Sequence, residues 1–117
     1  MPYAILSSPL PWIGVLRELE AYPVSALVPG HGPVMASHDY TRTVRETLDV
    51  IRLQIDSLYR AGLGLDDAAR TVNVDAMRER FRVPEGAGTR PVREAFFREW
   101  VRNVAEQMAA CVHGYRC

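Results

Sequence analysis

The residue with the clearest chemical potential is His31, which stands in the run Pro29-Gly30-His31-Gly32-Pro33. Glycine on either side allows positive φ and close approach of other groups, while the prolines restrict the chain around the turn. A neutral imidazole held in one orientation is a common metal ligand. The pattern therefore predicts a metal ligand on a rigid turn or, as the alternative, an ordinary tight turn whose histidine faces water.

Two further groups of possible metal ligands are weaker candidates. His38 lies at the start of a long predicted helix, where an exposed side chain near the helix cap is expected. Cys111, His113 and Cys117 place three soft ligands within seven residues, but their spacing matches no common zinc site and is typical of a frayed tail. His31 is therefore the only metal ligand predicted, and no catalytic residue is assigned.

Several functional classes lack the residues that they need. All fourteen basic residues are arginine, which excludes Schiff-base and lysine-nucleophile chemistry. Neither a Gly-x-Ser-x-Gly elbow nor a phosphate-binding loop occurs. The formal net charge is zero, so we expect neither nucleic acid nor a membrane surface as a partner.

Helices must position the turn, because apolar residues spaced three and four apart dominate the sequence. The predicted helices span about residues 11–21, 38–61, 65–71, 75–81 and 91–111. A short buried strand is predicted over residues 24–28, which are mainly apolar and are followed by Pro29. The side chains expected to form the core are Leu16, Leu19, Val44, Leu48, Ile51, Ile55, Leu58, Phe97, Trp100, Val101 and Val104.

The helix over residues 38–61 is the best-defined element. Its polar face carries Arg45 with Asp49 and Arg52 with Asp56, each pair four residues apart, so both are expected to form ion pairs. Gly62 is expected to end the helix in the left-handed conformation.

The predicted fold class is predominantly α with one or two short strands. We expect a single partial domain over residues 1–117, because no repeat and no long linker divides the chain. Residues 1–36 would form a helix-strand-loop unit that carries the Pro-Gly-His-Gly-Pro turn, and residues 37–117 a helical region.

Four segments follow one another in a recognisable order. They are Pro2-Tyr3-Ala4, Trp12 with Leu16 and Leu19, Ala26-Leu27-Val28-Pro29-Gly30-His31-Gly32-Pro33-Val34, and a long helix ending in Gly62-Leu63-Gly64-Leu65-Asp66-Asp67-Ala68. This order resembles the carboxy-terminal section of metallo-β-lactamase-fold hydrolases, over about residues 2–82 and more loosely to residue 108. The resemblance implies part of an αββα sandwich, in which His31 matches the last ligand of a site for one or two zinc ions.

The sequence departs from that family where the principal metal ligands stand. The motif His-x-His-x-Asp-His has no counterpart, the only histidines are His31, His38 and His113, and no aspartate precedes Asp39. A catalytic zinc normally takes three protein ligands and an open position for water. We therefore expect a carboxy-terminal fragment of a zinc-dependent hydrolase for ester, thioester or lactam bonds that is not catalytically competent alone.

A rival hypothesis is a small helical interaction module without catalytic activity. Apolar helix faces that should cover a sheet would be exposed if the other strands are missing, so they would need a partner. The expected partner is the missing amino-terminal portion of the fold or a second copy of the chain. A small-molecule substrate is expected only if the fold is complete.

Length and composition set the outer limits. The chain has 117 residues, of which 48% are hydrophobic and 24% charged, which is typical of one modest globular domain. No run approaches the roughly 20 apolar residues of a membrane-spanning helix, and the amino terminus does not resemble a signal peptide. A soluble, cytoplasmic protein is therefore expected.

Overall fold

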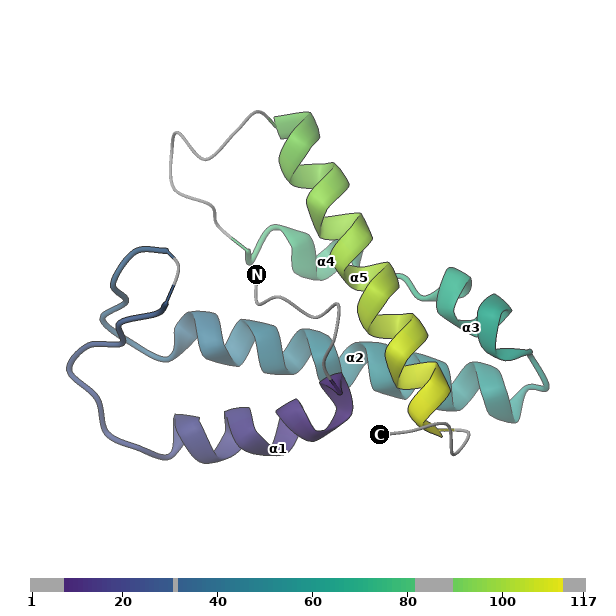
Figure 1. Ribbon diagram of the computed structural model, residues 1–117, viewed down its shortest axis with the longest axis horizontal. Helices are drawn as coiled ribbons and strands as arrows, with labels where there is room; N and C mark the ends of the chain where they lie inside the picture. Colours follow the sequence, from purple (N-terminus) through teal and green to yellow (C-terminus); the bar gives the residue numbers. More distant parts are fainter. Residues whose placement is uncertain (1–7, 31, 82–89, 113–117) are drawn as a thin grey trace.

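The computed structural model describes residues 8–30, 32–81 and 90–112. Within these ranges the chain is predominantly helical, as predicted (Figure 1). The helices are α1 (Pro9–Glu20), α2 (Asp39–Arg60), α3 (Leu65–Thr71), α4 (Asp75–Arg78) and α5 (Arg90–Val112). Each predicted helix is present, and its ends differ from the predicted ones by at most a few residues.

Helices α1 and α2 lie side by side in opposite directions (Figure 1). Their polar edges are joined by ion pairs in which Arg17 contacts Asp49 at 3.0 Å and Arg45 contacts Glu20 at 2.7 Å. The hydrogen bond from Arg45 to Glu20 raises the pKa of the guanidinium. The later residue of α1, Glu20, pairs with the earlier residue of α2, Arg45, so the two helices run antiparallel.

Helix α2 has the boundaries and charge pairs that its sequence predicts. Arg45 and Asp49 are 3.3 Å apart, and Arg52 and Asp56 are 3.1 Å apart. Gly62 follows the helix with a φ of +89°, and two backbone N–H groups reach back to the carbonyls of the last turn. This is a Schellman ending, which explains the glycine.

Helix α5 crosses α2 obliquely, and α3 packs beside α5 (Figure 1). The core lies where these helices meet. Leu48, Ile51, Ile55, Val104 and Met108 have no exposed surface. Within the described residues, no helix combines the length and apolar character needed to cross a bilayer.

Eight of the eleven predicted core residues are buried, namely Val44, Leu48, Ile51, Ile55, Phe97, Trp100, Val101 and Val104. The prediction is wrong for Leu19, which is exposed, and too strong for Leu16 and Leu58, which are half-buried. Pro9 and Ile13 are the buried residues of α1 instead. The helix packs on the core through these two residues and through partly buried Leu10, Trp12 and Leu16, and Leu19 lies outside this face.

The strand predicted over residues 24–28 does not form within the described part of the chain. Leu27 makes a single antiparallel bridge with Met35, and Val28 is 78% exposed. An apolar segment becomes a buried strand only when other strands pair with it. The described segments offer only this one bridge, so residues 24–28 form an irregular segment rather than a strand.

Candidate functional site

The turn that carries His31 is closed by two short backbone hydrogen bonds. The Leu27 N–H donates to the Met35 carbonyl at 2.7 Å, and the Met35 N–H donates to the Leu27 carbonyl at 2.9 Å. This pair fixes both ends of the seven intervening residues, 28–34. The described residues on either side of position 31 therefore belong to a connection between α1 and α2 whose two ends are hydrogen-bonded to one another (Figure 1).

His31 itself lies outside the described residues, so its role as a metal ligand is still a prediction. Its neighbours Gly30 and Gly32 are both exposed, and Gly32 has a φ of +108°. A Cβ at Gly30 would meet nothing within 4 Å, and one at Gly32 would meet only Pro29 Cγ at 3.9 Å. Positive φ therefore explains Gly32, whereas the expected close approach of other groups is not seen.

His38 is half-buried rather than exposed as predicted. Its Nε2 lies 2.9 Å from the carbonyl oxygen of Tyr22, just beyond α1. A carbonyl can only accept, so Nε2 carries the hydrogen and donates it. Its Nδ1 is buried and has no hydrogen-bond partner in the described structure. The imidazole thus ties the start of α2 to the end of α1, which is a structural contact that sequence spacing could not reveal.

The other possible ligands do not assemble into a metal site. Cys111 is buried at the end of α5 and is disulfide-bonded, so it offers no thiolate. His113 and Cys117 lie outside the described residues. Among the residues whose positions are described, no group of three or more histidine, cysteine, aspartate or glutamate side chains could hold a metal ion. The donor set therefore does not fit the catalytic zinc that the family resemblance implies.

An exposed apolar surface borders this region, and we call it the α1 stripe. It consists of Val15, Leu19 and Tyr22, which follow one another at intervals of four and three residues. Val15 is 60% exposed and Tyr22 is 66% exposed. Val15 and Leu19 share one side of the helix, away from buried Ile13, and Tyr22 lies two residues beyond the end of the helix. Helix α1 is therefore apolar on two sides, of which the core covers one.

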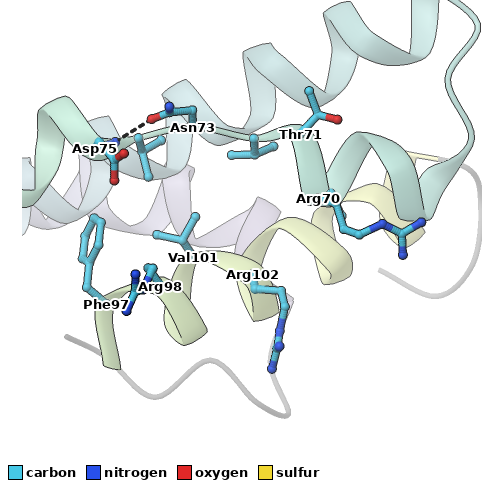
Figure 2. Close-up of a pocket in the computed structure, with 11 residues that line it drawn as sticks. Arg70, Thr71, Asn73, Asp75, Phe97, Arg98, Val101 and Arg102 are labelled. Atoms are coloured by element: carbon cyan, nitrogen blue, oxygen red, sulfur yellow. Dashed lines mark hydrogen bonds between the residues drawn. The ribbon is translucent and has the colours of Figure 1, made fainter. Parts of the chain in front are cut away.

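A groove that the sequence does not reveal lies between the α3–α4 connection and α5. The groove is open to solvent and has a volume of about 410 Å³. Figure 2 shows Asn73 and Asp75 on one wall, with Phe97, Arg98 and Val101 on the other. The two walls are more than twenty residues apart in sequence, so spacing alone gives no signal for the groove.

No protein-family model matches the chain, and neither the curated proteins nor the solved structures contain a match.

Proposed function

We propose that the chain is the carboxy-terminal helical portion of a metallo-β-lactamase-fold hydrolase and that it is catalytically inactive alone. The observation that carries this proposal is the α1 stripe. A helix that only covers a core needs one apolar side and presents polar residues on the other. A second apolar side, exposed at Val15 and Leu19 and followed by exposed Tyr22 just beyond the helix, is typical of a helix that lies between two layers.

The turn beside this helix supports the same arrangement. Val28 and Val34 flank the Pro-Gly-His-Gly-Pro run and are 78% and 63% exposed. The backbone around Leu27 is extended enough to bridge with Met35, but it has no further strand partner among the described segments. A sheet placed against the α1 stripe and this turn would cover these apolar side chains.

The proposed contribution of the chain to the active site is one imidazole, that of His31. The other metal ligands would come from outside it, because the sequence lacks the His-x-His-x-Asp-His motif of the family that it resembles. The substrate class, an ester, thioester or lactam bond, is part of the proposal through the family resemblance alone. No catalytic step is assigned to any described residue.

Zinc titration and a thioester hydrolysis assay on the purified 117-residue chain test the inactive-alone part of the proposal. We expect no stoichiometric zinc binding at submicromolar affinity and no turnover above the buffer rate. His31→Ala should behave like the wild type in both assays, with His113→Ala as the matched control. Tight, stoichiometric zinc binding and thioester turnover in the wild type, both lost in His31→Ala but not in His113→Ala, would contradict the proposal that the chain is inactive alone.

The gene provides the test of family membership. An in-frame His-x-His-x-Asp-His motif upstream of the codon for Met1 would support a hydrolase. Its absence would favour the second candidate, a helical interaction module. That candidate is favoured by the core itself, which includes buried residues from α1, α2, α3 and α5 and has fully buried side chains at its centre.

A further inference from the structure

The groove of Figure 2 is lined by several polar groups, most of which are already engaged within the protein. The Arg70 guanidinium donates to Asp67 at 2.7 Å, and this contact raises the pKa of Arg70. Thr71 donates its hydroxyl hydrogen to the Asp67 carbonyl at 2.6 Å. Arg102 lies 3.4 Å from Glu99 and 3.9 Å from Glu106. Two of the three guanidiniums at the groove are therefore neutralised by carboxylates.

The connection that forms the opposite wall is also fixed from within. The side chain of Asn73 accepts a hydrogen bond from the Asp75 N–H at 2.9 Å, which Figure 2 marks with a dashed line. The backbone of Asn73 is held by the side-chain amide of Gln54 in α2. This wall is therefore positioned before any ligand arrives.

Two charged side chains of opposite sign at the groove have no partner among the described residues. The side chains of Arg98 and Asp75 both line the groove, yet neither makes an ion pair or hydrogen bond with any described residue, including one another. The same groove is lined by the buried apolar side chains of Val74, Phe97 and Val101. An exposed, unpaired cation and an exposed, unpaired anion thus line one groove together with apolar side chains.

We propose that this groove binds a small zwitterion with an apolar side chain, the chemical class of the α-amino acids. Arg98 would receive the carboxylate of the ligand, and Asp75 would receive its ammonium group. The apolar side chain would rest against Phe97 and Val101. The proposal needs no metal and does not depend on the proposed hydrolase ancestry.

A simple anion or cation satisfies this groove less well. An anion beside Arg98 would leave the Asp75 carboxylate unpaired and would lie in its repulsive field. A cation beside Asp75 would leave the Arg98 guanidinium unpaired and would be repelled by it. A zwitterion pairs with both charges, although each contact is exposed and adds only a modest amount of affinity. We therefore expect dissociation constants in the millimolar range.

The test is an NMR titration of the isotope-labelled chain with three probes of similar apolar length, namely L-norleucine, hexanoate and hexylamine. Norleucine is expected to give saturable shifts at residues 71–75 and 97–102. Hexanoate and hexylamine should each bind about three- to fivefold more weakly, the factor expected for one exposed charge pair. Hexanoate binding as tightly as norleucine would overturn the zwitterion proposal, as would the absence of saturable shifts in the groove.

Two charge-removing variants separate the contributions. Arg98→Gln should weaken norleucine and hexanoate but not hexylamine, whereas Asp75→Asn should weaken norleucine and hexylamine but not hexanoate. The matched controls are Arg60→Gln and Asp66→Asn, which alter exposed charges outside the groove. A control variant that changed norleucine binding as much as the groove variants would overturn the proposal. Urea unfolding of each variant verifies that the fold is retained.

Discussion

Gln54 and Asn73 exchange two hydrogen bonds across 19 positions of sequence. The Gln54 Nε2 donates to the Asn73 carbonyl at 2.7 Å, and the Asn73 N–H donates to Gln54 Oε1 at 2.9 Å. A side-chain amide that offers one donor and one acceptor matches the N–H and C=O of a single residue. This pairing attaches the α3–α4 connection, which is one wall of the groove, to the long helix α2.

Replacing Gln54 should loosen that wall. We expect Gln54→Ala to lower the free energy of unfolding by about 1 kcal/mol, because two partly exposed hydrogen bonds are lost to a backbone that water can still reach. Urea unfolding measures the change, and hydrogen exchange should show faster exchange at the Asn73 amide. Gln54→Glu keeps the acceptor and loses the donor, so slow exchange at Asn73 should be largely retained. Equal loss of protection in both variants would contradict this assignment.

The two leucines at positions 48 and 53 of α2 provide a matched test of the core. Leu48 is fully buried, whereas Leu53 is 56% exposed on the same helix. Leu48→Ala should cost about 2–5 kcal/mol, because it removes buried surface and leaves a cavity. Leu53→Ala should change stability by no more than about 0.5 kcal/mol. Urea unfolding measures both changes. Similar losses of unfolding free energy in the two variants would contradict the burial of Leu48 and the exposure of Leu53.

The attachment of α1 to α2 should depend on salt. Glu20 accepts hydrogen bonds from Arg45 at 2.7 and 3.3 Å, and its side chain is only 15% exposed. Glu20→Gln should therefore destabilise the fold by about 1–2 kcal/mol at low ionic strength, because the charge-assisted pair is lost. The difference from wild type should shrink in molar salt, which screens the remaining charges. A difference that does not change with salt, measured by denaturation at two salt concentrations, would contradict an electrostatic origin.

The half-buried phenol of Tyr40 should make stability fall at alkaline pH. Burial raises the pKa of Tyr40 above its ordinary value of 10.0, and its ring packs edge-on against Phe81. Because the folded state holds the phenol proton more tightly than the unfolded state, stability is fully present below about pH 10 and is lost as the pH rises through the folded pKa. Urea midpoints measured from about pH 8 to 11 should fall less steeply for Tyr40→Phe. The same slope in both proteins would rule out Tyr40 as the cause, and Tyr59→Phe is the exposed control.

The α1 stripe should bind apolar ligands or partners without supporting the fold. Changing Val15, Leu19 and Tyr22 together to serine should lower binding of a hydrophobic dye or self-association in light scattering. The free energy of unfolding should change by no more than about 1 kcal/mol, because these side chains are already exposed. Dye binding equal to wild type would mean that the α1 stripe is not an apolar contact surface. The buried substitution Ile13→Ser is the contrasting variant and should unfold the chain more easily.

The sequence by itself determined the helices and most of the core. The apolar spacing in α2 is regular over six turns, and the Gly62 ending follows from local backbone rules that need no tertiary partner. For the same reason the Arg45–Asp49 and Arg52–Asp56 pairs were predictable, since positions four apart on a helix are always neighbours.

Long-range packing determines which apolar side of α1 is covered, that residues 24–28 stay irregular, and that His38 joins α1 to α2. Each depends on a partner distant in sequence, or on the lack of one among the described segments. The groove has the same origin, because Asp75 and Arg98 line one groove only when α3 packs on α5. Local spacing fixes which side chains share a face, but long-range packing fixes what that face meets.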